Sequence, residues 1–330
     1  MNFSFIIPVY NRPDETKELL DSLAIQSDLD FEVVIVEDGS KNTSEEVINK
    51  FSSKLNIKYL FKENTGPGDS RNYGMKRASG DYFIILDSDC ILPTSYFENV
   101  KKGLKQDYVD CFGGPDKALD SFSDVQKAIN YAMTSFFTTG GIRGGSEKVE
   151  KFQPRSFNMG LSKKAFEESD GFGNIHPGED PDLSIRLWKK GYETTLIKEA
   201  FVYHKRRIDW NKFFIQVNKF GKARPILDSW YPEYSKITFW FPSLFLVGTL
   251  FAIITAFFQI YLPISLLFAY FLMIFIDSTI KNKSVKVGML SVIATFIQFY
   301  GYGKGYLLSF IKIKLLKQEP KKAFPELFFK

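Results

Sequence analysis

Apolar and polar positions alternate in blocks along the first third of the chain. Short runs of consecutive apolar residues, typical of strands buried on both faces, are separated by stretches with an apolar residue at every third or fourth position, typical of helices. The expected strands cover residues 3–9, 31–36, 57–61 and 82–86. The expected helices cover residues 14–25, 44–51 and 70–78. This alternation predicts an α/β fold with a mostly parallel sheet that helices cover on both faces.

Beyond residue 110 the pattern becomes less regular. Glycine pairs mark an irregular region that contains one expected helix; the pairs lie at 113–114, 140–141 and 144–145, and the helix at 123–137. Order returns with expected helices at 163–169 and 180–190 and with a strand inside 194–203. A long loop region inside a compact domain is usually functional, so we expect the irregular region to border a binding site.

No charged side chain lies within residues 237–276. A helix of about twenty apolar residues is long enough to cross the hydrocarbon core of a membrane. A break at Gln259–Pro263 divides the stretch into two expected spans, 238–258 and 261–277. Helices packed in a soluble core would have a polar face, and these have none. We therefore expect a membrane hairpin inside a membrane region of two to three helices at 237–306.

A third apolar stretch, residues 287–302, has two interpretations. Lysines flank the hairpin at Lys236 and Lys281, which places both ends of the hairpin on the cytoplasmic side by the positive-inside tendency. The tail, 307–330, is also basic. If the third stretch crosses the membrane, this tail lies on the opposite side, whereas a re-entrant or interfacial segment keeps all basic residues on one side. The length of the stretch favours a third span.

Residues 208–228, just before the hairpin, have an apolar face and a basic face. Phe213 and Val217 lie on the apolar face, and Lys212 and Lys219 lie off it. This pattern is typical of a basic amphipathic helix on an anionic membrane surface. It is equally typical of a surface helix that packs on its own domain. Both interpretations remain open at this point.

Composition and charge restrict the class of protein. The formal net charge is +5, and the basic residues form short clusters beside apolar segments rather than one broad patch, so no nucleic-acid partner is expected. Two cysteines, Cys90 and Cys111, are too few for a disulfide framework and suit a reducing compartment. The apolar run that begins at Phe3 has no basic region before it and no cleavage site after it, so no signal peptide is expected.

Two acidic clusters provide candidate chemistry. The first, Asp-Ser-Asp at 87–89, directly follows the expected strand 82–86, and its carboxylates are the oxygen ligands that Mg²⁺ or Mn²⁺ accepts. The second, Glu-Asp-Pro-Asp at 179–182, begins an expected helix, where carboxylates also favour the positive end of the helix dipole. Ligands of parallel sheets gather at the carboxyl ends of strands, where residues 8–10, 37–38 and 87–89 lie.

Five motifs together resemble the family 2 glycosyltransferases of the GT-A fold, a Rossmann-like fold with a mostly parallel mixed sheet. The motifs lie at 5–11, 33–40, 70–74, 80–89 and 178–184. The resemblance covers residues 1 to about 205. It implies a GT-A catalytic domain at 1–225, followed by C-terminal transmembrane helices. It also implies a metal-dependent, inverting glycosyltransferase of the hexosyltransferase type.

The resemblance implies roles for residues near the nucleotide. Pro8 and Tyr10 would border the base and the ribose. Asp38 would accept a hydrogen bond from the imide N–H of a uracil or thymine ring, and a UDP-sugar is the favoured donor. The family often has two aspartates where this chain has Glu37 and Asp38. Arg71 would lie near the base or the phosphates.

The resemblance also implies a metal site and a catalytic base. Asp89 would bind Mg²⁺ or Mn²⁺, Asp87 would contact the ribose or a water on the metal, and His204 would complete the metal shell. Asp180, with Glu179 beside it, would be the general base that removes the proton of the acceptor hydroxyl. Positioned proton transfer of this kind contributes roughly 10²–10⁴-fold to the rate.

The resemblance and the membrane hairpin together indicate transfer of a sugar to a lipid-linked or glycan acceptor, in the synthesis of a cell-surface polysaccharide or glycolipid. We expect a multi-pass protein of the inner (cytoplasmic) membrane with a cytoplasmic catalytic domain. A polyprenyl-phosphate sugar synthase is a near alternative, since a phosphate acceptor is already ionised and needs no strong base. A catalytically silent, nucleotide-binding membrane scaffold is a more distant one.

Overall fold

The computed structural model describes residues 1–140, 151–205 and 209–329. Parts of the expected glycine-rich region and of the basic run that follows His204 lie outside these residues. The chain forms two compact units. Among the described residues, the first, called the sheet unit, comprises 1–117, 151–205 and 328–329, and the second, called the helical unit, comprises 118–140 and 209–327.

Neither unit is one continuous stretch of sequence. Residues 118–140 and 209–225 belong to the helical unit, whereas Phe328 and Phe329 belong to the sheet unit. The reason lies in side-chain packing that a linear boundary cannot express. One apolar cluster of the helical unit combines residues from three separate stretches: Ala128, Ile129, Ala132, Met133, Phe213, Val217, Val287 and Ala294.

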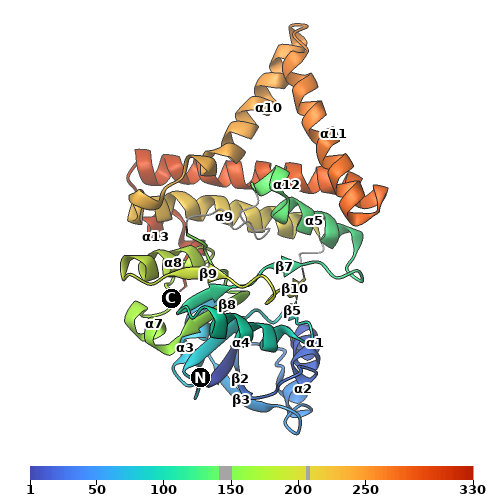
Figure 1. Ribbon diagram of the computed structural model, residues 1–330. Coiled ribbons are helices and arrows are strands. Elements are labelled where there is room, and N and C mark those ends of the chain that lie inside the picture. Colours follow the sequence, from blue (N-terminus) through green and yellow to red (C-terminus); the bar gives the residue numbers. More distant parts are fainter. Residues whose placement is uncertain (141–150, 206–208, 330) are drawn as a thin grey trace. The chain divides into compact units, whose positions relative to one another are not determined.

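The sheet unit contains a mixed, mostly parallel sheet with the strand order β3-β2-β1-β4-β8-β6-β9 (Figure 1). Its strands are β1 (Phe3–Val9), β2 (Phe31–Asp38), β3 (Asn56–Lys62), β4 (Tyr82–Leu86), β6 (Cys111–Gly113), β8 (Asn158–Ser162) and β9 (Thr194–Leu196). β8 pairs antiparallel with β4 and β6, and the other neighbours pair in parallel. The predicted α/β fold with a mostly parallel mixed sheet is therefore confirmed.

A smaller sheet and several helices complete this unit. The small sheet has the order β5-β10-β7, with β5 (Cys90–Ile91), β7 (Asp116–Lys117) and β10 (Val202–His204). The helices are α1 (Pro13–Ala24), α2 (Glu45–Asn49), α3 (Pro67–Met75), α4 (Tyr96–Gln106), α7 (Lys163–Ser169) and α8 (Glu179–Lys189). The small sheet matters for the site because it places His204 of β10 opposite Cys90 of β5.

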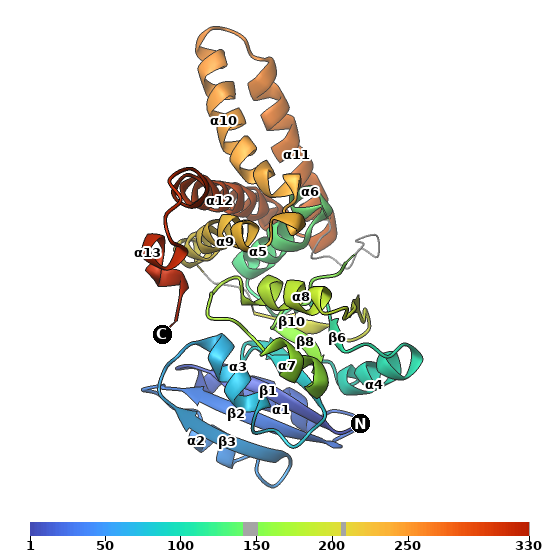
Figure 2. The same cartoon turned by 90° about the vertical axis from the view of Figure 1, so that its left-hand side faces the viewer.

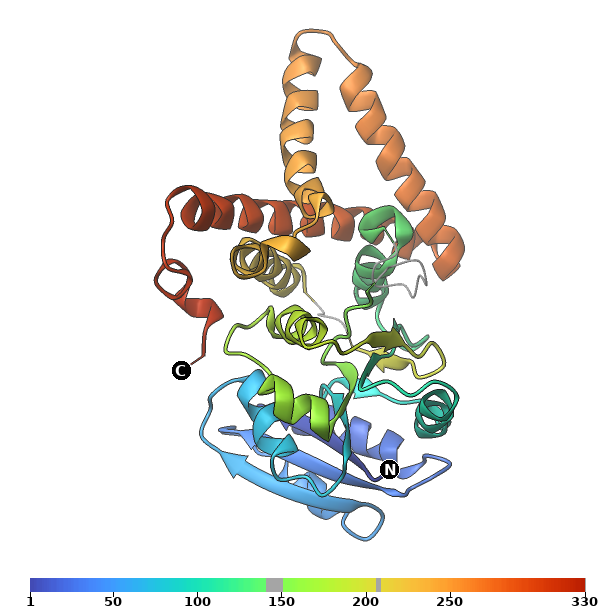
Figure 3. The same ribbon diagram turned by 60° about the vertical axis from the view of Figure 1, so that its left-hand side comes forward.

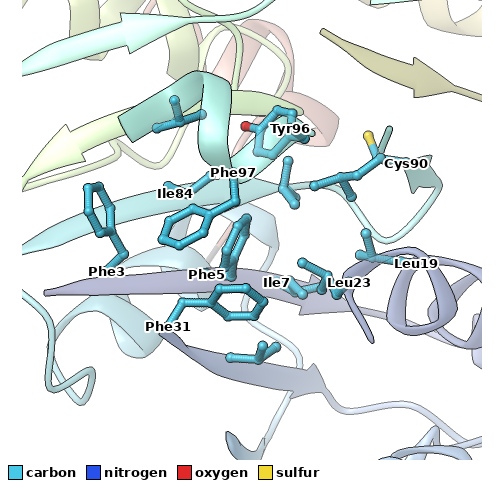
Figure 4. Close-up of a cluster of buried hydrophobic side chains, with 14 of the residues drawn as sticks. Phe3, Phe5, Ile7, Leu19, Leu23, Phe31, Ile84, Cys90, Tyr96 and Phe97 are labelled. Atoms are coloured by element: carbon cyan, nitrogen blue, oxygen red, sulfur yellow. The ribbon is translucent and has the colours of Figure 1, made fainter. Parts of the chain in front are cut away.

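The continuous apolar runs of the strands are buried on both faces. Alternate side chains of β1 enter different clusters, because Phe5 lies in one apolar cluster and Ile6 lies in the other. Aromatic rings from β1, β2 and α4 pack edge to face in the first cluster (Figure 4); Phe5 and Phe31 have ring centroids 4.8 Å apart, and Phe31 and Phe97 5.1 Å apart. This double burial makes the strand ends rigid supports for the polar residues that follow them.

The helical unit contains a hairpin of two apolar helices and a third long helix that lies across the base of the hairpin (Figures 1 and 3). Its helices are α5 (Asp124–Thr134), α6 (Phe136–Thr139), α9 (Trp210–Trp230), α10 (Phe241–Phe257), α11 (Leu262–Asn282), α12 (Val285–Ser309) and α13 (Pro320–Ala323). A π-helix, Phe310–Leu315, continues α12, and short 3₁₀ turns cover Pro232–Tyr234, Ile237–Trp240 and Pro325–Leu327.

Three stretches of the helical unit are long and apolar enough to cross a membrane: Ile237–Phe257, Leu262–Asn282 and Val285–Leu315. Two of them coincide with the expected spans of the hairpin. The apolar face of α9 is covered by protein, since Phe213 and Val217 are buried in the cluster that α5 and α12 share. The apolar face of α9 therefore faces α5 and α12 rather than lipid.

Candidate active site

A buried arginine joins the two acidic clusters. Arg71 lies on α3, and its side chain is only 3% exposed. Its Nη2 atom donates a hydrogen bond to Asp87 Oδ1 at 2.7 Å, and its Nη1 atom donates to Glu179 Oε1 at 3.2 Å. Asp87 directly follows β4, and Glu179 is the first residue of α8. One guanidinium group therefore holds both carboxylates at the same site, at the carboxyl edge of the sheet.

A glycine, Gly178, directly precedes α8 and allows the backbone to turn into the helix. Gly178, just before the helix, has a φ angle of 129°, a backbone conformation that residues with a side chain rarely adopt. Glu179, Asp180 and Asp182 fill the first turn, where the backbone N–H groups favour negative charge. The same turn therefore serves both the helix and the site.

Glu179 and Asp180 are adjacent in the chain but differ in electrostatic surroundings. Burial works against the charge of Glu179, but His176 and Arg71 outweigh it and lower the pKa of this carboxyl group. Burial and the charge of Glu179 raise the pKa of Asp180 to about 6. The Oδ1 atom of Asp180 is enclosed and accepts no hydrogen bond from the described residues. Asp180 is thus the carboxylate that can take up a proton near neutral pH.

His176 lies at the site although the sequence analysis assigned it no role. Its Nδ1 atom lies 2.7 Å from Glu179 Oε1. Burial disfavours the charge of the imidazole, but the neighbouring Glu179 carboxylate raises the pKa of His176 above its usual value. The only sequence signal was its position three residues before the acidic cluster, which does not specify a contact.

Asp89 and His204 form the candidate metal site. The Nε2 atom of His204 lies 3.2 Å from Asp89 Oδ1, and both side chains are 13% exposed. The ring of Phe157 stacks on the imidazole with centroids 4.7 Å apart and fixes its orientation. Cys90 is the third member of the group, with ligand atoms within 4.8 Å of one another. A carboxylate and an imidazole fit Mn²⁺, for which a thiol is a poorer ligand.

Arg12 lies beside Asp89, and Asp116 lies beside His204. Arg12, which follows β1, donates from Nη1 to Asp89 Oδ2 at 2.6 Å. Asp116 Oδ2 lies 3.9 Å from His204 Nδ1. Asp87, which was expected to share the metal site, lies outside the group of Asp89, Cys90 and His204 and pairs with Arg71. Sequence reasoning missed Arg12, whose only signal is its place in the short loop between β1 and α1.

Asp38 lies at the end of β2 and is only 4% exposed. Its Oδ1 atom accepts hydrogen bonds from Lys62 Nζ at 2.7 Å and Thr65 N at 3.0 Å, and its Oδ2 atom accepts from Gly66 N at 3.0 Å. These donors order the loop that leads into α3. A carboxylate offers about four acceptor positions, so one position on Oδ2 remains for a ligand.

The other residues expected at the nucleotide lie at the same edge of the sheet. Pro8 lies in β1 beside Val36 of β2 and is half-buried. Tyr10, just beyond β1, is 53% exposed. Glu37 takes a structural role, since its carboxylate accepts hydrogen bonds from Ser40 Oγ and Ser44 N. Parallel pairing of β1 with β2 and β4 thus places five expected residues at one edge of the sheet: Pro8, Tyr10, Asp38, Asp87 and Asp89.

The profile of the family described as "Glycosyl transferase family 2" matches residues 4–169 of the chain. An uncharacterized glycosyltransferase of Rickettsia felis is 42% identical over 135 residues, which are 41% of this chain and 22% of that protein. Chondroitin synthase of Escherichia coli is 27% identical over 234 residues, which are 61% of this chain and 34% of the synthase.

A third relative is the poly(ribitol-phosphate) β-N-acetylglucosaminyltransferase TarS of Staphylococcus aureus. It is 41% identical over 93 residues, which are 27% of this chain and 16% of TarS. The chain therefore spans about a third or less of the length of these relatives.

Among solved structures, the chain is similar to the mannosyltransferase PcManGT from Pyrobaculum calidifontis in complex with GDP-Man and Mn²⁺. The TM-score is 0.62 at 14% sequence identity, and the match covers 88% of this chain and 86% of that one. At this identity the likeness shows that the two proteins share a fold.

Proposed function

Because the chain belongs to glycosyl transferase family 2, we propose that it transfers a sugar with inversion from a nucleotide-diphosphate sugar, a UDP-sugar in the first place, to a lipid-linked or glycan acceptor at a membrane. The expected setting is the synthesis of a cell-surface polysaccharide or glycolipid. The observation that carries the proposal is the pair of contacts of Arg71, which hold the Asp87 and Glu179 clusters at one site.

The two carboxylates at the start of α8 support a division of labour. Glu179 stays ionised because Arg71 and His176 pair with it, and it positions those two cations. Asp180 has a pKa raised to about 6, close to the pH at which a general base is most effective. In the proposed reaction Asp180 accepts the proton of the acceptor hydroxyl as its oxygen attacks the anomeric carbon.

The residues of the metal group support the use of a divalent cation. Asp89 and His204 would hold Mn²⁺ or Mg²⁺, and a bound cation would neutralise the charge of the departing nucleoside diphosphate. Arg12, bonded to Asp89, adds positive charge beside the same carboxylate. The roles of Pro8, Tyr10 and Asp38 at the base and the ribose remain part of the proposal, as does the contact of Asp87 with the ribose or with a water on the metal.

The apolar helices support an acceptor that resides in a membrane. Stretches 237–257 and 262–282 are long and apolar enough to anchor the enzyme there. Lysines at both ends of this hairpin favour a cytoplasmic location for those ends and for the catalytic unit, in the inner membrane of a bacterial-type cell. An anchored enzyme works beside a lipid-linked acceptor without having to extract it from the bilayer.

Thermal stabilisation of the detergent-solubilised protein by nucleotide sugars, with and without Mn²⁺, tests the donor and the metal together. A ligand that binds only the folded state raises Tm. We expect UDP-sugars to raise Tm when Mn²⁺ is present and to lose this effect in Asp89→Ala and His204→Ala. Equal stabilisation of the parent and of Asp89→Ala would refute the metal role. An unchanged Tm with every nucleotide sugar would refute the proposal that the donor is a nucleotide sugar.

A further inference from the structure

The path of the chain limits how often it crosses a bilayer. Phe328 and Phe329 belong to the sheet unit. The N–H of Phe329 donates to Asn174 O at 3.2 Å, and Phe328 forms an antiparallel bridge with Ile175. The chain therefore leaves the sheet unit after residue 205 and returns to it at 328. A chain that returns to the same unit crosses a bilayer an even number of times, yet three stretches are apolar enough to cross.

The contacts of α12 with the hairpin indicate that α12 is the apolar stretch that does not cross the bilayer. Ser243 donates to Gly303 O at 3.3 Å at the beginning of α10, and Ser278 and Ser291 hydroxyls lie 2.7 Å apart near the end of α11. The tip of the hairpin is far from such contacts, since Phe257 is 84% exposed. α12 thus contacts the beginning of α10 and the end of α11, and it does not run along the hairpin to its tip, as Figures 1 and 3 show.

The partner of α12 on its other side is a charged helix. A Cβ atom at Gly221 of α9 would lie 2.1 Å from Tyr302 O, and a Cβ atom at Gly305 would lie 2.2 Å from Asn218 O. The two backbones are therefore in direct contact, and α9 and α12 lie side by side in both views (Figures 1 and 2). α9 also carries Lys212, Lys219 and Lys222. Lysines are costly in hydrocarbon, so α9 and its partner belong at the headgroup level.

The exposed surface of α12 is mostly an apolar stripe. Its apolar residues lie three, four or eight positions apart, which places them on one side of the helix: Val285, Met289, Ile293, Phe296, Tyr300 and Leu308. Ile311 and Leu315 continue the series in the π-helix, and the exposed Lys286, which pairs with Asp124, lies at the beginning of α12. Lys304 is exposed on the same stripe. The buried side is lined by small residues that allow close packing, among them Gly288, Ser291, Gly301 and Gly305. An apolar stripe with a lysine at the surface fits the boundary between lipid headgroups and acyl chains.

We propose that α12 lies in the plane of the membrane surface beside α9, with its apolar stripe in the bilayer, and that only α10 and α11 cross. The proposal rests on the membrane location in the proposed function and reverses the expectation of a third span. It keeps the basic tail on the side of the sheet unit. Lys304 and the exposed tail lysines Lys317 and Lys321 then face an anionic lipid surface, the partner to which this charge is complementary.

Depth measurement in the full-length protein tests the proposal. Spin labels are attached to single cysteines at Met289, Ile293, Tyr300 and Leu308, and the protein is reconstituted in vesicles of phosphatidylethanolamine and phosphatidylglycerol. Their depths follow from collisions with lipid-soluble oxygen and with a water-soluble nickel complex. The parent protein, whose Cys90 and Cys111 are buried, gives the unlabelled baseline.

The expected result is one common depth for the four α12 positions. A crossing helix would instead place Tyr300 deepest and Met289 near a surface, because the rise from Met289 to Leu308 is roughly 28 Å. Labels at Phe241, Val247 and Phe257 of α10 are the matched control, and they must give a deep middle position. A depth profile of α12 that resembles this control would overturn the proposal. The readout does not involve catalysis, so it stands apart from the test of the proposed function.

A second measurement asks on which side each end lies. Ser53→Cys in the sheet unit and Gln318→Cys after α12 are exposed positions. A membrane-impermeant maleimide should label both variants from the same face of sealed membrane vesicles. Labelling of Ser53→Cys and Gln318→Cys from opposite faces would show an odd number of crossings and refute the proposal.

Discussion

At the scale of single residues, the chemistry depends on how two adjacent carboxylates are surrounded. Glu179 is bonded directly to Arg71 and lies 2.7 Å from the Nδ1 atom of His176, which hold it ionised. At Asp180 burial and the charge of Glu179 dominate, and they raise its pKa to about 6. The sequence shows two adjacent carboxylates, but it does not show which of them has the higher pKa.

The pH dependence of transfer follows from the raised pKa of Asp180. Below about pH 6 the carboxyl group of Asp180 is protonated and cannot accept a proton. We expect kcat/KM to fall about tenfold for each pH unit below this value and to level off above it, as for a general base. Steady-state rates between pH 5 and 8 measure the profile, and donor affinity measured over the same range separates this effect from loss of metal. A flat profile would contradict the role of Asp180.

The bridging arginine should be the most sensitive position for stability. Arg71→Ala leaves the buried Glu179 with His176 alone as its charged partner, and breaking a buried ion pair by removing one partner costs about 3 kcal/mol or more. Denaturant unfolding of the detergent-solubilised protein measures the loss. Arg77→Ala, which removes an exposed arginine just after the same helix, is the matched control and should change stability by less than about 0.5 kcal/mol. Equal stability of the two variants would show that Arg71 does not bind the clusters together.

At the scale of elements, the sequence predicted those helices and strands that are long enough to show a periodic pattern of apolar residues. The strand ends at Val9, Asp38 and Leu86 lie on one edge because parallel pairing puts them there, so Tyr10 and Asp87 could be placed in advance. A strand of two or three residues is too short to show a pattern of apolar positions. For this reason none of the strands of the small sheet was recognisable as a separate strand: β5, β7 and β10. The expected helix 123–137 is interrupted at Ser135, which caps a second helix.

Contacts between loops could not be predicted from the pattern. Arg12 meets Asp89 across 77 positions of sequence, and Arg71 meets Glu179 across 108. Which side chains meet across such separations depends on the paths of the connecting loops, which periodicity does not encode. The sequence therefore indicated the carboxylate ligands after β4 directly, and His204 and the proposed base only through the resemblance to a family. It missed Arg12 and His176 altogether.

The close contact of α9 and α12 leads to a prediction with an internal control. In Gly221→Ala the added methyl group would lie 2.1 Å from Tyr302 O, a backbone atom, so the two helices must separate. We expect Tm to fall by several degrees, since overpacking costs typically about 1–3 kcal/mol. Gly248→Ala, in α10, meets nothing within 4 Å and should leave Tm unchanged or raise it. A Gly221→Ala protein as stable as Gly248→Ala would contradict the direct backbone contact.

At the scale of the whole molecule, the chain combines a sheet unit that contains the candidate active site with a helical unit that has an exposed apolar surface. The exposed side chains of α10 and α11 include Phe251, Phe257, Leu262 and Phe268, which are 58%, 84%, 69% and 70% exposed. A soluble protein rarely leaves such a contiguous apolar surface uncovered, because its exposure to water is unfavourable. The absence of charged residues from 237 to 276 already predicted that this part of the chain lies in a membrane.

This apolar surface determines how the protein behaves on extraction. We expect the full chain to stay in the membrane pellet after washes with high salt or alkaline carbonate, and to dissolve only in detergent, because its hairpin is long enough to cross the bilayer. Fractionation followed by immunoblotting checks this, with a purely electrostatically bound protein as the control. Release by salt alone would mean that lysines, and not the hairpin, hold the protein to the membrane.

The measurement that tests the central claim most directly is a comparison of donor binding and turnover in Asp180→Asn. The account predicts unchanged affinity for the nucleotide sugar, because Asp87, Asp89 and Arg71 remain, with turnover reduced at least about 100-fold by the loss of the base. Asp182→Asn, which removes a carboxylate from the same helical turn, should keep its turnover and so exclude a general effect of the helix. Full turnover by Asp180→Asn would contradict the account, and would favour an acceptor that is already ionised.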